Sequence, residues 1–122
     1  MNVKIDTKEK FHVITILETG LTANMTEDMQ KLFEEFRQKE VKNIVLNMKG
    51  VRLMDAGMAQ ILLSEQNQAY ENSHSFVICC LDKSLEEWLD KAEVLEMMNV
   101  TPTETEAWDI IQMEEIEREL MD

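Results

Sequence analysis

The chain has 122 residues, the size of one compact domain with a single hydrophobic core. Its apolar share of 44% is that of a folded protein, and no apolar run reaches the roughly 18 residues that a membrane span requires. The formal net charge of −13 argues against nucleic-acid binding, which depends on clustered Lys and Arg, and favours a protein partner with a basic face. The first residues alternate between apolar and polar without a signal-peptide layout, so we expect a cytoplasmic protein.

The N-terminal third predicts a hairpin followed by a helix. Residues 3–6 alternate, residues 11–17 are almost continuously apolar, and the polar stretch 7–10 is short enough for a turn. Residues 20–24 are expected to form a loop with helix-capping residues near its end. Apolar side chains at helical spacing then predict a helix whose core face comprises Met25, Met29, Leu32, Phe33 and Phe36.

The middle of the chain predicts a strand, a helix and a second strand. Residues 43–48 form a buried-looking strand, residues 51–54 are a short apolar piece, and an amphipathic helix begins near Asp55. The apolar run 75–81 is typical of a central strand that helices cover on both faces. The inner face of the helix that begins near Asp55 is expected to comprise Met58, Ile61, Leu62, Glu65 and Ala69.

Two capping boxes, each a Ser or Thr followed three residues later by Glu, predict the last two helices. They lie at residues 84–87 and 103–106, and a short strand is expected between them within residues 94–101. Strands that alternate with helices indicate an α/β domain with a mixed, mostly parallel sheet of four or five strands and about four helices. Nothing in the sequence divides the chain, so residues 1–122 are expected to form one domain.

The end of the last helix allows two interpretations. Residues 113–122 are rich in acidic side chains and are expected to project past the body of so small a domain as a frayed extension. The alternative is a docking arm whose apolar contacts are Ile116 and Leu120.

The residue types that catalysis requires do not form a motif. Three glycines cannot make a phosphate-binding loop or a dinucleotide fingerprint. Cys79 and Cys80 are strand neighbours that point to opposite faces, so we expect them to pack in the core and not to form a disulfide or bind a metal. His12 and His74 have no evident partner in the sequence. We therefore expect a protein that is not an enzyme and that uses no metal or cofactor.

Four segments, in their shared order, resemble the STAS domain, the fold of bacterial anti-sigma factor antagonists. The resemblance covers essentially the whole chain and implies a STAS-like single domain that binds a regulatory partner protein, with partner switching in the control of transcription. The segments are the opening hairpin, residues 43–48 with 53–55, residues 81–85 and residues 101–107, and residues 113–120 are also similar to the tail of STAS proteins from Bacteroidetes.

In the family that the chain resembles, one strand ends in Asp-Ser-Ser-Gly-Leu or a close variant, and a partner kinase phosphorylates the second serine, which breaks the complex. Aligned without a gap, Asp55 matches the aspartate, Ala56 the first serine and Gly57 the phosphoacceptor, whereas a one-residue deletion matches Gly57 to the motif glycine. Neither alignment leaves a hydroxyl at the acceptor position. The next hydroxyl, on Ser64, lies about 13 Å farther along the helix. The resemblance thus implies a member without the usual phosphorylation switch.

The resemblance places partner binding at the loop after Leu21 and at the first turns of the helix from Asp55. Asp55 also has a purely structural interpretation, because at a helix start it can cap the N–H group of Gly57 or Met58. Gly57 either suits a tight first turn or lets a partner backbone approach closely, and Met58 is expected in an adaptable contact surface. The candidate partner-binding residues are Thr22, Asn24, Asp55, Ala56, Gly57 and Met58.

Three functions follow from these observations. The first is a non-catalytic binding domain of the anti-sigma antagonist type, whose partner is an anti-sigma factor or a kinase-like regulator. The second keeps the fold but makes the protein an accessory subunit of a membrane transport ATPase, since fold does not fix function. The third is a small-molecule sensor with a ligand cleft near Asp55 and Gly57.

Overall fold

The computed structural model describes residues 1–121. Its strands are β1 (Val3–Thr7), β2 (His12–Ile16), β3 (Gly20–Leu21), β4 (Ile44–Asn47), β5 (Leu53–Met54), β6 (Phe76–Cys79) and β7 (Val100–Thr101). Its helices are α1 (Thr26–Arg37), α2 (Ala56–Glu71), α3 (Lys83–Lys91) and α4 (Glu104–Met121), with two short 3₁₀ helices, η1 (Ala23–Met25) and η2 (Leu95–Met97).

The main sheet has the strand order β1-β2-β4-β6-β7, and a separate small sheet pairs β3 with β5. β1 and β2 form an antiparallel hairpin, whereas β2 with β4, β4 with β6, β6 with β7 and β3 with β5 are parallel. All residues of β4 and β6 are buried, as expected of parallel strands that are covered on both faces. The predicted α/β class, with a mixed, mostly parallel five-stranded sheet and four helices, is confirmed.

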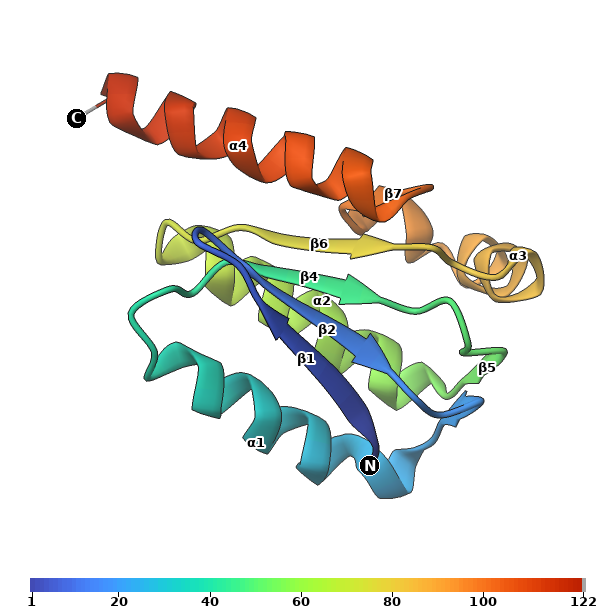
Figure 1. The fold of residues 1–122 in the computed structure, drawn as a ribbon. Helices are drawn as coiled ribbons and strands as arrows, with labels where there is room; N and C mark the ends of the chain where they lie inside the picture. The colour runs from blue at the N-terminus through green and yellow to red at the C-terminus, as the bar shows by residue number, and fades with distance from the viewer. Residues whose placement is uncertain (122) are drawn as a thin grey trace.

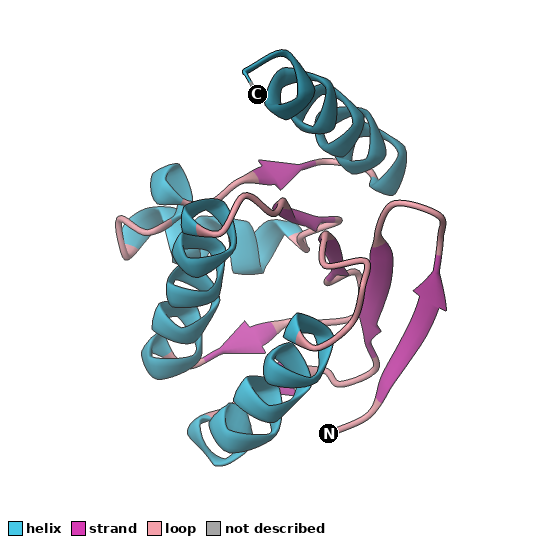
Figure 2. Ribbon diagram, turned by 90° about the vertical axis from the view of Figure 1, so that its left-hand side faces the viewer, coloured by secondary structure: helices cyan, strands magenta, loops and turns pink. Residues whose placement is uncertain are grey.

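Helices cover the two faces of the sheet unequally (Figures 1 and 2). The larger core lies under α1, α2 and α3, and the smaller core lies between the sheet and α4, where Ile111 is fully buried. Because neighbouring strand residues point to opposite faces, Val45 lies in the smaller core and Leu46 in the larger one. The larger core is centred on Phe33, Phe36, Leu46, Met58, Leu62, Phe76 and Leu89, and the smaller one on Phe11, Val13, Val45, Val77, Cys79, Ala107 and Ile111.

Most predicted elements are present, and the differences concern their ends. Gly20 and Leu21 were expected in a loop but form β3, because they pair with the short strand β5. The capping box predicted at residues 84–87 is wrong, since α3 begins at Lys83 and the side chain of Asp82 accepts the N–H of Ser84 at 3.1 Å. The second capping box is confirmed in its main contact: Oγ1 of Thr103 accepts the N–H of Glu106 at 3.2 Å.

The inner face of α2 includes a charge. Met58, Leu62 and Ala69 are buried as predicted, and Ile61 is half-buried. Glu65 is also buried, and its carboxylate forms an ion pair with Arg37 of α1. Burial raises the pKa of Glu65, while the neighbouring guanidinium opposes that rise. The pair therefore joins the C-terminal half of α1 to the middle of α2.

His12 forms hydrogen bonds within the fold, and the two cysteines are free thiols. His12 is buried, and its Nε2–H donates to the carbonyl of Val41 at 2.8 Å while Nδ1 accepts the hydroxyl of Thr7 at 2.9 Å. The cysteines are not bonded to each other, and Cys79 packs in the smaller core, as predicted. The prediction that their side chains point to opposite faces is wrong, because β6 ends at Cys79 and Cys80, with a φ of 63°, packs against the same core. Burial raises the pKa of the Cys79 thiol, so it stays neutral.

The segment expected to project from residue 113 onward is helical and contacts the body of the domain over most of its length. Glu114, Glu115 and Arg118 form hydrogen bonds to residues of α2 and of the segments that precede β4 and β6. Its outward side chains are exposed, most of all those of Leu120 and Met121 in the last turn. Within residues 1–121, the structure contains no helix that combines the length and apolar character needed to cross a bilayer.

Candidate partner-binding site

The small sheet brings the two candidate segments together. β3 and β5 lie side by side in parallel, so the residues that follow them, Thr22 and Asp55, are neighbours in space. The N–H of Asp55 donates to the carbonyl of Leu21 at 3.0 Å and continues this pairing by one residue. The loop before α1 and the start of α2 thus form one surface, as the sequence predicted.

The Asp55 carboxylate binds this loop and not its own helix. Asp55 has the extended backbone of an N-cap residue, with φ −79° and ψ 152°, but its side chain accepts no hydrogen bond from the first turn of α2. Its Oδ2 atom accepts the backbone N–H of Ala23 at 2.7 Å. The predicted capping of Gly57 or Met58 is therefore wrong, because the β3–β5 pairing brings the Ala23 donor to the carboxylate. The contact fixes η1 against the start of α2.

The first two residues of α2 present an open surface. Ala56 and Gly57 are exposed, and a Cβ atom added at Gly57 would have no atom within 4 Å. The φ angle of Gly57 is not positive, so its backbone conformation does not require glycine. The first turn of α2 therefore does not require glycine at this position, and a larger side chain would fit in its place.

The remaining candidates differ in exposure. Thr22 and Asn24 are exposed beside the start of α2. Met58, by contrast, is fully buried in the larger core, because it lies on the inward face of α2. The expectation that Met58 belongs to a contact surface is therefore wrong.

One exposed apolar residue at this site was not predicted as a contact. Leu53 in β5 is 71% exposed, whereas its neighbour Met54 is buried. Leu53 lies in an apolar stretch of the sequence, and residues of such a stretch are ordinarily expected to be buried. Its exposure was therefore not predicted. The alternation of side chains along a strand is the signal that could have identified it. Leu17, at the end of β2, is a second exposed apolar side chain, at 55%.

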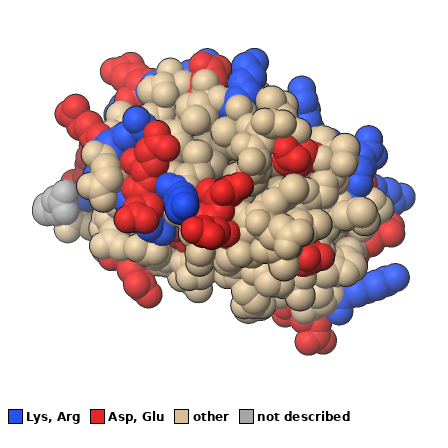
Figure 3. Space-filling model, turned by 90° about the horizontal axis from the view of Figure 1, so that it is seen from below, with Lys and Arg blue, Asp and Glu red and all other residues tan. Residues whose placement is uncertain are grey.

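A charged pair lies beside the site. Arg52 pairs with Asp82 at 2.7 Å and so connects the segment before β5 to the start of α3. Hydrogen bonds from Ser84 hold the pKa of Asp82 below its usual range, and the Arg52 charge adds to this effect. The exposed face of α2 that continues from Gly57 is uncharged as far as Asn67, with Gln60 and Ser64 between them. Seen from below, the molecule shows a largely uncharged area interrupted by a few acidic side chains, with charges of both signs gathered toward one end and at the margins (Figure 3).

The surface offers no enclosed space for a small ligand at Gly57, since an added side-chain atom there would meet open space. A cavity of about 370 Å³ lies elsewhere, between the C-terminal halves of α1 and α2, where Arg37, Glu65 and His74 contribute to its lining. Among residues 1–121, no three His, Cys, Asp or Glu side chains are grouped so that they could hold a metal ion. The candidate surface instead presents exposed backbone, the side-chain amide of Asn24 and the side chain of Leu53. Groups of this kind make contacts between proteins.

Comparison with known proteins identifies the family. The family model described as STAS domain matches residues 2–107, so the chain belongs to the STAS domain family. A putative anti-sigma factor antagonist from Thermotoga maritima superposes with a TM-score of 0.76 at 15% sequence identity, covering 90% of this chain and 94% of that one. The anti-sigma factor antagonist SpoIIAA in its unphosphorylated form gives 0.71 at 16%, covering 91% and 96%.

The same fold occurs inside a larger membrane protein. The structure of the murine solute carrier 26 family member A9 anion transporter, in its inward-facing state, matches with a TM-score of 0.71 at 15% identity. The match covers 85% of this chain but only 18% of the transporter chain. These comparisons establish the STAS fold of the described residues.

Proposed function

We propose that this protein is a non-catalytic regulatory STAS domain that binds a partner protein, as anti-sigma factor antagonists do. The contact surface comprises the loop after β3 and the first turn of α2. It acts in the cytoplasm, and its partner is an anti-sigma factor or a kinase-like regulator. The residues that make the contact are Thr22, Asn24, Leu53, Asp55, Ala56 and Gly57.

The observation that carries this proposal is the Asp55–Ala23 hydrogen bond together with the exposed residues around it. The bond holds two chain segments as one rigid surface, and a preorganised surface loses less conformational entropy on binding. Leu53, 71% exposed, supplies an apolar contact on this surface. Similarity to the antagonists from Thermotoga maritima and SpoIIAA supports the choice of partner class.

We also propose that the contact is not controlled by phosphorylation at the family's acceptor position. Ala56 and Gly57 carry no hydroxyl, and the space beside Gly57 is open. A phosphate there would add about −1.5 to −2 charges, enough to disturb a close contact. Without it, binding depends on the amount of each protein or on competition with phosphorylatable relatives.

The proposal is tested by affinity capture of the tagged protein from a lysate of its source organism, with quantitative mass spectrometry. Leu53→Asp places a charge in the proposed contact without touching the core, and Ile5→Asp, in the edge strand β1 and 45% exposed, is the matched control outside it. We expect a histidine-kinase-like regulator to co-purify with the wild type and with Ile5→Asp but not with Leu53→Asp. Equal recovery with all three would reject this surface.

A second experiment tests the lost switch. In the double variant Ala56→Ser/Gly57→Ser, the open surface accommodates both hydroxyls. If the captured regulator is a kinase of the expected class, it labels the double variant from radioactive ATP and leaves the wild type unlabelled. Absence of labelling by a regulator that phosphorylates another STAS protein would contradict the partner class.

An accessory role in membrane transport is the second candidate, and the occurrence of this fold within an anion transporter favours it. In that case the capture experiment recovers the nucleotide-binding subunit of a transport ATPase, and Leu53→Asp abolishes the recovery. The two candidates thus share a surface and differ in the protein that binds it.

A further inference from the structure

The C-terminal helix extends beyond the part of the chain that defines the family. The family match ends at residue 107, whereas α4 continues to Met121. The first half of α4 completes the smaller core with Ala107 and Ile111. The second half has few apolar contacts with the domain, so its role is not explained by the core.

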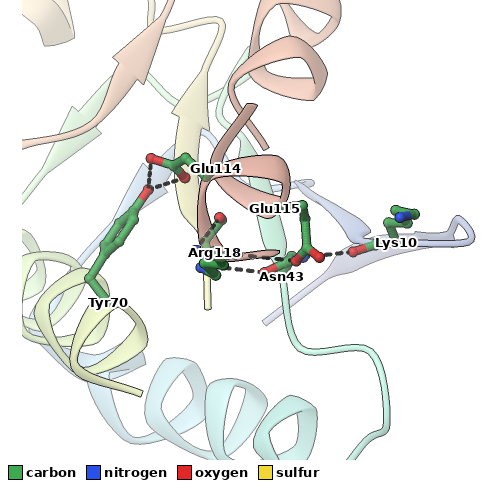
Figure 4. Close-up of polar contacts among 7 residues, drawn as sticks. Lys10, Asn43, Tyr70, Glu114, Glu115 and Arg118 are labelled. Atoms are coloured by element: carbon green, nitrogen blue, oxygen red, sulfur yellow. Dashed lines mark hydrogen bonds and ion pairs between the residues drawn. The ribbon is translucent and has the colours of Figure 1, made fainter. Parts of the chain in front are cut away.

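Polar contacts fix the orientation of this second half (Figure 4). Its inward face is hydrogen-bonded to three separate parts of the domain, which prevents rotation of the helix about its axis. The contacts are Tyr70 to Glu114 at 2.8 Å, Asn43 to Glu115 at 2.7 Å and Arg118 to Ser75 at 2.7 Å. A helix held in this way presents a constant outer face to solvent.

That outer face is apolar. Met113, Ile116 and Leu120 are 59%, 56% and 80% exposed. Their spacing of three and four residues places them in one row, within about 40° of the direction opposite Ile111 at 3.6 residues per turn. Single exposed apolar residues are common on proteins, but a row over successive turns is the pattern of a helix seam.

The charge around the row indicates what can bind it. Residues 104–121 contain seven acidic residues and one basic residue, a net charge of −6 in a chain of −13. The single base, Arg118, already donates to Ser75 and Glu115. A second copy of α4 would bring acidic flanks together, whereas a basic helix would find opposite charges on both sides.

We propose that Met113, Ile116 and Leu120 form a docking row for an amphipathic helix of a partner protein, one that carries Lys or Arg beside its apolar face. This row lies on the face of the sheet opposite α1 and α2 and is independent of the surface around Asp55. It therefore provides a second contact on the same domain.

The test uses the full chain and a fluorescein-labelled peptide of three heptads with Leu at the seam and Lys beside it. A peptide of the same composition in scrambled order controls for charge alone. We expect the ordered peptide to bind the wild type and to lose about tenfold in affinity with Ile116→Ser/Leu120→Ser, because two apolar contacts are removed. Leu17→Ser, another exposed apolar position, is expected to bind as the wild type does.

Fluorescence anisotropy gives the affinities, and sedimentation velocity gives the oligomeric state of the chain alone. Equal binding of the ordered and scrambled peptides, or no loss in the double variant, would overturn the proposal. A dimer of the wild type that the double variant abolishes would also overturn it, since the row would then bind a second copy. The altered side chains are exposed, so unchanged thermal unfolding will confirm that the variants fold. Asp55→Ala, which affects only the other surface, is expected to leave peptide binding unchanged.

Discussion

Gly57 is a residue whose backbone does not need glycine. Its φ angle is not positive and the space around it is open. Glycine in a helix has more freedom in the unfolded chain than alanine, so it lowers stability unless something else requires it. A requirement of the bound partner, such as close backbone approach, would be one such reason.

Gly57→Ala is therefore expected to raise the free energy of unfolding by about 0.5 kcal/mol. Urea denaturation of the two proteins measures the difference, and Ala56→Gly is the reverse control, which should lower it. If the same Gly57→Ala protein also captures less of its partner, the glycine serves binding. A loss of stability would show that the backbone at this position is constrained after all.

The surroundings of His74 disfavour its protonated form. Partial burial lowers its pKa from the ordinary value of 6.5, and the nearby charges of Lys42 and Arg118 lower it further, while Glu115 acts in the opposite direction. As the pH falls below 6.5, the unfolded chain takes up a proton that the folded chain resists. Stability associated with neutral His74 is present above that pH and is lost as the pH falls.

We expect the wild type to lose more stability than His74→Gln when the pH is lowered from 7.5 to 5.5. Chemical denaturation at both pH values gives the comparison, and the ring-proton resonance of His74 in NMR gives the pKa directly. An equal loss in both proteins would assign the pH dependence to other groups.

At the scale of elements, α4 depends on polar contacts as well as on its core residues. The hydroxyl of Tyr70 donates to Glu114 and accepts from Nδ2 of Asn99 at 2.6 Å. It therefore joins α4 to α2 and to the segment before β7. Burial and the Glu114 carboxylate raise the pKa of Tyr70, so the hydroxyl keeps its proton for this contact.

Tyr70→Phe removes the hydroxyl and is expected to lower the free energy of unfolding by about 1 kcal/mol. Amide hydrogen exchange should increase most in the second half of α4. Glu114→Gln, which keeps an acceptor oxygen, should have a smaller effect. Unchanged exchange in residues 113–121 would mean that the other two contacts suffice.

The sequence predicted elements well where a pattern was long and poorly where it was short. Helical spacing over Met29, Phe33 and Phe36 and the apolar run that contains β6 both gave the correct element. β3 and β5 have two residues each, too few to show a period, and they exist because they pair with each other. The contacts of α4 were missed for a similar reason, since Glu114 and Arg118 bind residues far away in the sequence.

At the scale of the whole molecule, two groups at opposite ends of α2 test how cooperatively the domain folds. Asp55 and Tyr70 are 15 residues apart, about 22 Å along the helix. Asp55→Ala removes the acceptor of the Ala23 N–H and is expected to cost about 1 kcal/mol, similar to Tyr70→Phe. The double variant should lose the sum of the two effects to within about 0.5 kcal/mol.

Urea denaturation followed by fluorescence and by far-ultraviolet circular dichroism measures all four proteins of this cycle. Coincident transitions and additive losses are expected of a two-state domain. A clear departure from additivity would reveal coupling between the candidate site and α4. Asp55→Asn, which retains an acceptor oxygen, is the control for Asp55→Ala.

That the loop after Leu21 and the start of α2 lie together could be predicted from the sequence, but which of their residues are exposed could not. The resemblance joined these two segments, and the pairing of β3 with β5 confirms that they are neighbours. Met58 and Leu53 are both apolar residues with apolar neighbours in the sequence. Which of them faces solvent depends on how α2 and β5 lie against the sheet. Only the packed structure separates the buried methionine from the exposed leucine.

The strand order also bears on how the protein behaves at high concentration. An exposed sheet edge can template pairing with another chain, which leads to aggregation. Here one edge is β1, where Lys4 and Asp6 are exposed charges, and the other is β7, which has only two residues. A charged edge and a very short edge are both poor templates for strand addition. We therefore expect the main sheet to resist joining edge to edge with another copy at high protein concentration.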